Sequence, residues 1–287
     1  GKSFMFPVAS FVYPIFINLD LFAAAGLNSM PKNRSEFLSA ARKLTNKSKN
    51  QYGWVLPLSL QSPNGAQNDV MSWVWASGKS MLKDGKPNLT NKDVISALKF
   101  IEVMYKEKLI SPGSFAKKEQ EKLEEFVNGR VGMTVSSLAH INMIRDRNPS
   151  LNFTITDFPA ADGYKGRRGL PYAAWGIGIS QHSKHKEEAW KLVSYLMSPE
   201  VNSKLVSIAN AFPGNVHAKP DFVTSDKLFG KGFKIFQSGY LANEFTGLPV
   251  AEELMRMFNE EIQLMLEGKQ TAEQAAAKAQ AKWIAEF

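Results

Sequence analysis

Residues 124–137 read Glu-Glu-Phe-Val-Asn-Gly-Arg-Val-Gly-Met-Thr-Val-Ser-Ser, and this stretch predicts the fold class. Phe126 and Val127 form the apolar end of an amphipathic helix, and Gly129 can adopt the left-handed conformation that ends a helix. Residues 131, 133 and 135 are apolar and alternate at strand spacing. Polar residues follow where the strand ends, which is where open α/β sheets bind ligands. We therefore predict an α/β protein with a ligand loop at Ser136, Ser137 and His140.

On both sides of this stretch, the same alternation of strands and helices continues. Strands are expected at 52–58, 153–158 and 172–180, and helices are expected after the capping residues Asn33, Asn91, Ser183 and Thr271. Alternating strands and helices favour an α/β architecture. The chain has 287 residues, and a domain usually has roughly 100–200, so one large or two medium domains are expected.

Composition excludes several classes of function. The chain has no cysteine, which excludes disulfides and thiolate metal sites, and its four histidines show no metal-ligand spacing. We therefore expect no metal and no cofactor. The net charge is +8, but basic and acidic residues are interleaved, as in the segment 119–125. This pattern indicates a solvated basic surface, and we expect no nucleic-acid partner.

Catalytic motifs are also missing from the sequence. It contains no Gly-x-Ser-x-Gly elbow and no glycine-rich phosphate loop after a strand. A glycoside-acting enzyme would need two carboxylates about 5–10 Å apart in a cleft. The candidate cleft segments contain essentially only Asp69, so we expect no enzyme and keep a glycoside-acting enzyme as a distant alternative.

Seven short blocks occur in order along nearly the whole chain: residues 1–7, 17–27, 31–45, 126–135, 175–180, 188–200 and 267–275. The second reads Ile-Asn-Leu-Asp-Leu-Phe and ends in Ala-Gly-Leu, and the sixth contains Glu188-Ala189-Trp190 and Ser198-Pro199-Glu200. Together they resemble the extracellular solute-binding proteins (family 1) of ABC importers, in the group of maltose-binding-protein-type sugar binders.

This resemblance implies a periplasmic-binding-protein-like type II fold, with two lobes joined by a hinge. Residues 1–10 and 158–207 would be the remainder of the N-terminal lobe, and residues 11–157 and 208–287 the C-terminal lobe. Members of the family carry a further N-terminal segment that builds most of one lobe. The chain is therefore expected to be the C-terminal piece of a longer exported protein.

A sugar site combines aromatic plates with convergent polar side chains in a cleft. By their position in the resembled fold, three groups of residues would face that cleft. These candidates are Gln61, Ser62, Asn64 and Trp73; Ser136, Ser137 and His140; and Tyr172, Trp175, Asn210 and Phe212.

Some of these residues have a structural alternative. Trp73 is either a ligand plate or part of the core, and His140 either binds ligand or satisfies a loop carbonyl. Trp54 and Trp190 are expected in the core from their periodicity. The resembled family often has a tryptophan in the loop where this chain has Ala139 and His140, so we expect the site to rely on Trp175 across the cleft.

The implied function is capture of a carbohydrate, an oligosaccharide by preference, between the lobes and without catalysis. The implied partners are the sugar and the membrane permease subunits of an ABC transporter, for a monomeric protein. It would be exported to the periplasm or to the bacterial surface as a lipid-anchored protein. A binder of another solute, such as a peptide, a polyamine or a metal chelate, remains the alternative. Polyamine binding would need several carboxylates in the cleft.

Overall fold

The computed structural model describes residues 5–245, 248 and 250–287. Residues 1–4, part of the first of the seven sequence blocks, lie outside the described residues. The strands are β1 (Phe6–Val12), β2 (Ile15–Asn18), β3 (Leu82–Lys83), β4 (Lys86–Pro87), β5 (Met133–Val135), β6 (Phe153–Thr156), β7 (Gly169–Ile177), β8 (Phe212–Pro213) and β9 (Tyr240–Ala242). The helices are α1 (Leu19–Ala24), α2 (Arg34–Leu44), η1 (Lys47–Lys49), η2 (Ala66–Met71), α3 (Ser72–Trp75), α4 (Lys92–Lys106), α5 (Glu119–Val127), α6 (His140–Arg147), α7 (Lys186–Leu196), α8 (Pro199–Ala209), α9 (Phe222–Ser225), α10 (Lys227–Ser238), α11 (Ala251–Leu266) and α12 (Ala272–Glu286).

The upper body of the molecule is built around β2, the central strand of the sheet β5-β2-β6. Successive side chains of a strand point to opposite faces, so Ile15 and Ile17 enter one core and Phe16 the other. The larger core packs this sheet against α2, α3, α4, α11 and α12, while the smaller one lies under α5, α6 and α10. Because both faces are covered, every residue of β2 is buried.

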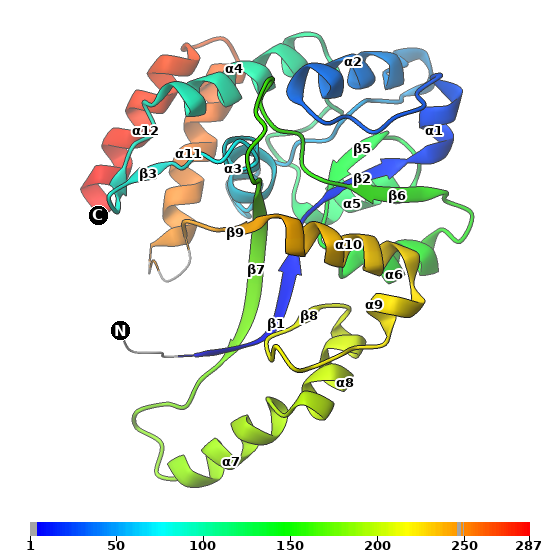
Figure 1. The fold of residues 1–287 in the computed structure, drawn as a ribbon. Coiled ribbons are helices and arrows are strands. Elements are labelled where there is room, and N and C mark those ends of the chain that lie inside the picture. Colours follow the sequence, from blue (N-terminus) through cyan, green and yellow to red (C-terminus); the bar gives the residue numbers. More distant parts are fainter. Residues whose placement is uncertain (1–4, 246–247, 249) are drawn as a thin grey trace.

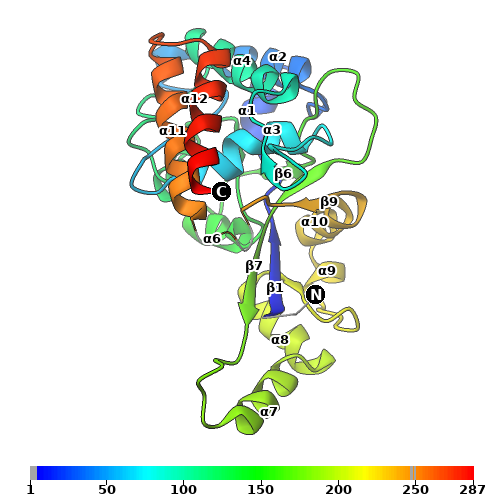
Figure 2. The same cartoon turned by 90° about the vertical axis from the view of Figure 1, so that its left-hand side faces the viewer.

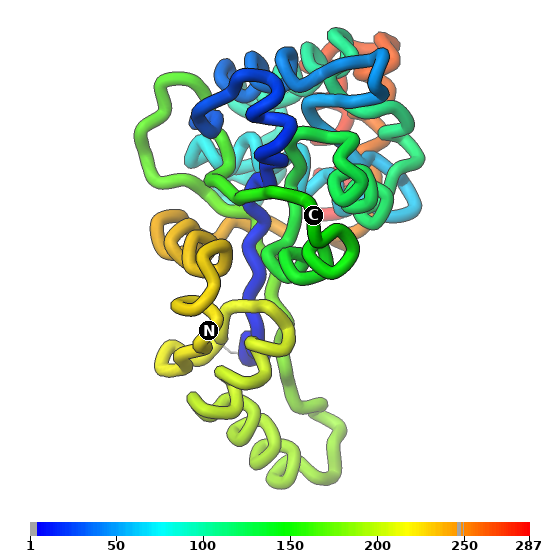
Figure 3. Tube along the Cα trace, turned by 90° about the vertical axis from the view of Figure 1, so that its right-hand side faces the viewer, coloured from blue at the N-terminus to red at the C-terminus, as the bar shows by residue number. Residues whose placement is uncertain are grey.

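The second sheet, β8-β1-β7-β9, connects the upper body to a lower body (Figure 1). Here β1 and β7 pair antiparallel and run side by side from one body into the other. The lower body contains α7 and α8, which remain below the sheet when the molecule is turned (Figure 2). The tube in Figure 3 shows β1 as one nearly straight connection between the two bodies.

The stretch 124–137 folds largely as its sequence predicts. α5 ends at Val127, Gly129 has φ +69°, and a strand and a polar loop follow. Phe126 is fully buried against Phe16 and Phe153, with ring centroids 6.1 and 6.2 Å away. The strand is shorter than predicted, because Val131 forms a bridge with Tyr52 before β5 begins at Met133.

Helix caps also agree with the sequence. Asn33 accepts a hydrogen bond from the Glu36 backbone N–H, and Asn91 caps α4 from its side chain. Thr271 and Gln274 form the expected reciprocal capping box. The helix predicted after Ser183 starts later, at Lys186, with His185 as its N-cap residue.

Two further expectations are wrong. The segment 52–58 forms no regular strand: it is extended and buried, but it has only single bridges, of Tyr52 with Val131 and of Trp54 with Ile110. Trp190 is not in a core, because it is 48% exposed and its ring packs on Phe6 at the start of β1 with centroids 5.6 Å apart. Within the described residues, none of the helices combines the length and the apolar character needed to cross a membrane.

We expect Phe126→Ala to destabilise the upper body by about 3–5 kcal/mol, because it removes a fully buried ring between two others. Urea unfolding, followed by circular dichroism, measures this loss. Phe126→Leu keeps most of the apolar volume and should lose much less stability. Equal unfolding midpoints for the alanine variant and the unchanged protein would contradict the packing described here.

Candidate functional site

The loop after β5 is hydrogen-bonded to the segment where the chain passes from one sheet to the other. Between β1 and β2, the backbone oxygen of Val12 accepts a hydrogen bond from the N–H of Leu138 (3.2 Å), and that of Pro14 accepts one from Ser136 (3.3 Å). The N–H of Tyr13 donates to the oxygen of Pro171 (3.1 Å). The loop is therefore fixed to the junction of the two bodies.

Within this loop, the polar side chains mainly bind each other. Ser136 Oγ lies 2.7 Å from His140 Nδ1, and Ser137 Oγ accepts a hydrogen bond from the N–H of Ala139 (3.3 Å). Both serines are buried and His140 is half-buried. Burial lowers the pKa of His140, so the ring is neutral at pH 7. The partner of His140 is thus a side-chain hydroxyl, not the loop carbonyl that the sequence suggested as the alternative to ligand.

Trp175 presents an aromatic face to solvent. It lies on β7 and is 59% exposed, while its ring packs on Phe11 with centroids 4.8 Å apart. Phe11 belongs to a small buried cluster of β1 and α8 against which Tyr13 and Ala139 also pack. Trp175 and Ala139 of the loop 136–140 therefore pack on the same small buried cluster.

Tyr172 does not share this region. Residues three apart in a strand point to opposite faces, so Tyr172 lies on the other side of β7 from Trp175. With Phe212 it lines a mostly apolar cavity of about 600 Å³ behind the sheet. Phe212 itself is buried against Phe233 and Phe236 of α10. The prediction that Tyr172 and Phe212 join Trp175 in one cleft is therefore wrong in this structure.

Trp73 is a core residue. It has no exposed surface, and its ring lies 4.7 Å, centroid to centroid, from both Phe100 and Phe158. Because these rings enclose the indole, it has no free face for a ligand, and its prediction as a plate is wrong. Trp54 is also fully buried, as expected.

The segment Gln61–Asn64 is hydrogen-bonded to α11. Asn259 Nδ2 donates to the backbone oxygen of Pro63 (3.2 Å). Gln61 and Asn64 are exposed and Ser62 is half-buried, so all three keep surface that a ligand can reach. Their role in binding stays a prediction.

Asn210 is half-buried and ends α8 in a left-handed conformation (φ 51°). Its Oδ1 accepts a hydrogen bond from Asn142 Nδ2 of α6 (2.7 Å), and Asn142 Oδ1 accepts one from Arg145 (3.1 Å). Arg145 in turn binds Asp226 before α10. This chain of polar contacts joins α6 of the upper body to α8 of the lower body.

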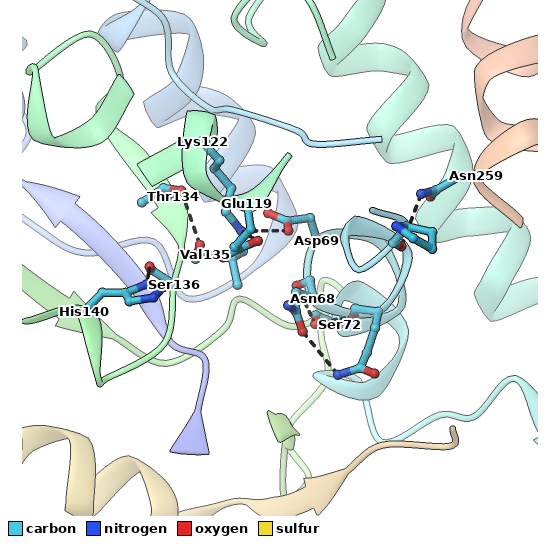
Figure 4. Close-up of polar contacts among 12 residues, drawn as sticks. Asn68, Asp69, Ser72, Glu119, Lys122, Thr134, Val135, Ser136, His140 and Asn259 are labelled. Atoms are coloured by element: carbon cyan, nitrogen blue, oxygen red, sulfur yellow. Dashed lines mark hydrogen bonds and ion pairs between the residues drawn. The ribbon is translucent and has the colours of Figure 1, made fainter. Parts of the chain in front are cut away.

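A buried cluster of charged side chains connects η2 to α5. Lys122 Nζ is 2.9 Å from Asp69 Oδ2 and 2.8 Å from Glu119 Oε2, and both Lys122 and Asp69 are fully buried. Figure 4 shows Glu119 between Ser136 and His140 on one side and Asn68 on the other. Burial raises the pKa of Asp69 to about 7, the nearby Glu119 adds to this, and Lys122 opposes it.

Sequence reasoning did not assign Phe11, Tyr13, Glu119 or Lys122 to the site. A signal was present in α5, where residues 119 and 122 share the inward stripe with Leu123 and Phe126. Charged residues on an apolar stripe indicate a buried ion pair. For the region that the structure describes, no group of three or more acidic, histidine or cysteine side chains could hold a metal ion.

Comparison with known proteins shows the family. Residues 1–203 match the family described as bacterial extracellular solute-binding protein, and the chain belongs to it. A binding protein of Brucella abortus is 29% identical over 232 residues, which cover 79% of this chain and 54% of that protein. Lipoprotein LipO of Bacillus subtilis is 24% identical, over 90% of this chain and 55% of LipO. The chain thus spans about half the length of these curated relatives.

Solved structures confirm the fold. An ABC-transporter solute-binding protein from Thermotoga lettingae, bound to α-D-tagatose, has a TM-score of 0.81 at 23% identity over 99% of this chain and 72% of its own. CpMnBP1 with bound mannotriose has a TM-score of 0.78 at 26% identity, over 98% and 73% respectively. The predicted type II, two-lobed α/β fold is confirmed. The extracellular family confirms the predicted export of the protein.

We expect the two tryptophans Trp73 and Trp175 to differ sharply in stability when each is changed to alanine. Trp73→Ala should cost about 3–5 kcal/mol, since it empties a closed core. Trp175→Ala should cost no more than about 1.5 kcal/mol, from the lost contact with Phe11. Urea unfolding of both variants measures the difference, and a larger loss for Trp175→Ala would contradict their assigned positions.

Proposed function

We propose that this chain is part of the substrate-binding component of an ABC importer and captures a carbohydrate, an oligosaccharide by preference. The observation that carries the proposal is the exposed indole of Trp175, which packs on Phe11, a member of the buried cluster that Ala139 of the polar loop also contacts. Aromatic plates with a few polar groups are what a sugar site needs. The likeness to sugar-bound proteins of the same fold supports the ligand class.

In this proposal, Trp175 stacks on the apolar face of a sugar ring. The exposed amides of Gln61 and Asn64 and the loop residues Ser137 and His140 bind its hydroxyls. His140 is neutral at pH 7, so it offers a ring nitrogen without a charge. Asn210, which accepts a hydrogen bond from Asn142 at the junction of the bodies, keeps its predicted role in binding the ligand.

We propose the lobe division that the sequence predicts. Residues 1–10 and 158–207, with α7 and most of α8, would belong to the N-terminal lobe, and residues 11–157 and 208–287 to the C-terminal lobe. The position of α7 and α8 below the strands β1 and β7 supports this division (Figure 2), whereas Phe158 and Ala160 pack in the upper body. Bending at these strands would close the lobes on the sugar and present them, as a monomer, to the permease subunits of the transporter.

We also propose that the protein has no catalytic step. Glycoside hydrolysis needs two carboxylates that are free to act as acid and base. The two carboxylates between the loops, Asp69 and Glu119, both bind Lys122 instead. Binding of a peptide, a polyamine or a chelate has no observation in its favour.

We expect calorimetry to detect binding of at least one neutral oligosaccharide from a panel of mannotriose, maltose and acidic uronate oligomers. Trp175→Ala should weaken that binding about tenfold or more, because stacking of roughly 1.4 kcal/mol is lost. Trp190→Phe is the matched control, since Trp190 is a second exposed indole that lies on α7. Absence of heat with every sugar would reject the carbohydrate assignment.

Closure of the two lobes can be measured independently of binding. With the sugar that binds best, small-angle X-ray scattering should show a smaller radius of gyration than without it. The same sugar added to Trp175→Ala at the same concentration should produce less compaction. An unchanged radius at saturation would reject the hinge.

A further inference from the structure

The buried charge cluster contains one cation, Lys122, for two carboxylates, Asp69 and Glu119. Lys122 Nζ binds Asp69 Oδ2 at 2.9 Å and Glu119 Oε2 at 2.8 Å, so the cluster carries one net negative charge when all three groups are ionised. Lys122 and Asp69 are completely buried. Burying a charge is costly unless it is paired, and here a single ammonium group serves two carboxylates.

Asp69 is the more deeply buried of the two carboxylates, with a side chain that is 0% exposed against 26% for Glu119, both of whose oxygens also lack a hydrogen-bond partner among the described residues. Within the same described residues, Asp69 Oδ1 has no hydrogen-bond partner. Asp69 lies on η2, a single π-helical turn, a rare geometry that often occurs at functional sites. Of the helices that pack on η2, α4 presents apolar side chains such as Leu98, and α11 presents the neutral Asn259.

The charged and titratable groups that face the cluster are few. α5 supplies Lys122 and Glu119, the junction of β1 and β2 supplies Tyr13, and α6 supplies His140, which Lys122 and Glu119 influence with opposite signs. Burial raises the pKa of Asp69 to about 7, against the pull of Lys122. Burial alone would lower the pKa of Lys122, but Asp69 and Glu119 outweigh it and the pKa lies above its usual value. Asp69 is therefore the group that exchanges a proton near neutral pH.

We propose that Asp69, Lys122 and Glu119 form a proton-operated switch beneath the cleft. When Asp69 is ionised, Lys122 is shared between the two carboxylates. When a proton from solvent binds Asp69 Oδ1, Lys122 pairs with Glu119 alone and the net charge of the cluster becomes zero.

The change reaches the ligand loop through Tyr13. Burial raises the pKa of Tyr13, the nearby Glu119 adds to this, and Lys122 opposes it. The backbone of Tyr13 also lies where the chain crosses from one sheet to the other. A shift of Lys122 toward Glu119 alters the charge that Tyr13 faces, and the residues on either side of Tyr13, Val12 and Pro14, bind the backbone of the loop at Leu138 and Ser136. The switch does not depend on which solute the cleft binds.

The test is a pH titration, between about pH 3 and pH 9, of the ligand-free chain with ¹³C-labelled aspartate carboxyl groups, followed by NMR. We expect one carboxyl signal with a midpoint near 7 that Asp69→Asn removes. Glu119→Gln should move this midpoint to lower pH, because the charge of Glu119 holds it up. Glu107→Gln is the control: Glu107 is an exposed carboxylate paired with Arg42, and its loss should leave the midpoint unchanged.

The effect of Asp69 on the loop 136–140 is measured separately in the same titration. The ring signals of Tyr13 and the amide signal of Ser137 should follow the midpoint of Asp69 in the unchanged chain and stop following it in Asp69→Asn. Titration of Asp69 near its ordinary value of about 3.9 would overturn the switch. Signals of Tyr13 and Ser137 that ignore Asp69 would overturn it as well. If Asp69→Asn does not fold, the shift of the titration midpoint in Glu119→Gln still tests the switch.

The affinity for mannotriose, measured as a function of pH, tests the switch and the proposed function separately. If mannotriose binds, its affinity should change across the midpoint of Asp69 and become independent of pH in Asp69→Asn. An affinity independent of pH in the unchanged chain would overturn the coupling of the switch to the cleft. Absence of binding at every pH counts against the sugar assignment, while the NMR titration still confirms or overturns the switch.

Discussion

The structure depends on one short crossing of the backbone, from Val12 to Pro14. The chain leaves one sheet at Val12 and enters the other at Ile15, so these residues belong to both bodies. Their backbone groups bind Pro171 in β7 and the loop 136–138 after β5. Buried backbone groups must find partners, and here the partners come from two distant parts of the chain. The same bonds therefore hold the two bodies together and position the polar loop between them.

Next to this crossing, the interior contains charges instead of apolar side chains. Lys122, Asp69 and Glu119 could be replaced by apolar residues without harm to packing, since a buried ion pair contributes little net stability. Their place beneath the loops of the proposed site suggests a role in function. A low-polarity surrounding strengthens each charge interaction and makes the cluster sensitive to a single proton.

The aromatic residues show where a sequence pattern reaches its limit. Trp73 and Trp175 are the same residue type, and both follow or lie in predicted secondary structure near candidate loops. One is enclosed by Phe100 and Phe158, and the other stands 59% exposed on Phe11. Phe100 and Phe11 are far from their partners in sequence, so local periodicity could not distinguish the two environments. Tyr172 and Trp175 illustrate the same limit, because a spacing of three places them on opposite faces of one strand.

The sequence by itself determined the elements and the family. The helix end at Gly129, the caps at Asn33, Asn91 and Thr271, and the alternation in β2 and β5 follow from local steric and hydrogen-bonding preferences. The ordered blocks carried the resemblance to solute-binding proteins, which the family match confirms. Only the tertiary structure decided which side chains meet. Lys122 lies 53 residues from Asp69 in sequence, and Trp175 contacts Phe11 across two paired strands. Such contacts depend on the packing of distant segments, which no local pattern specifies.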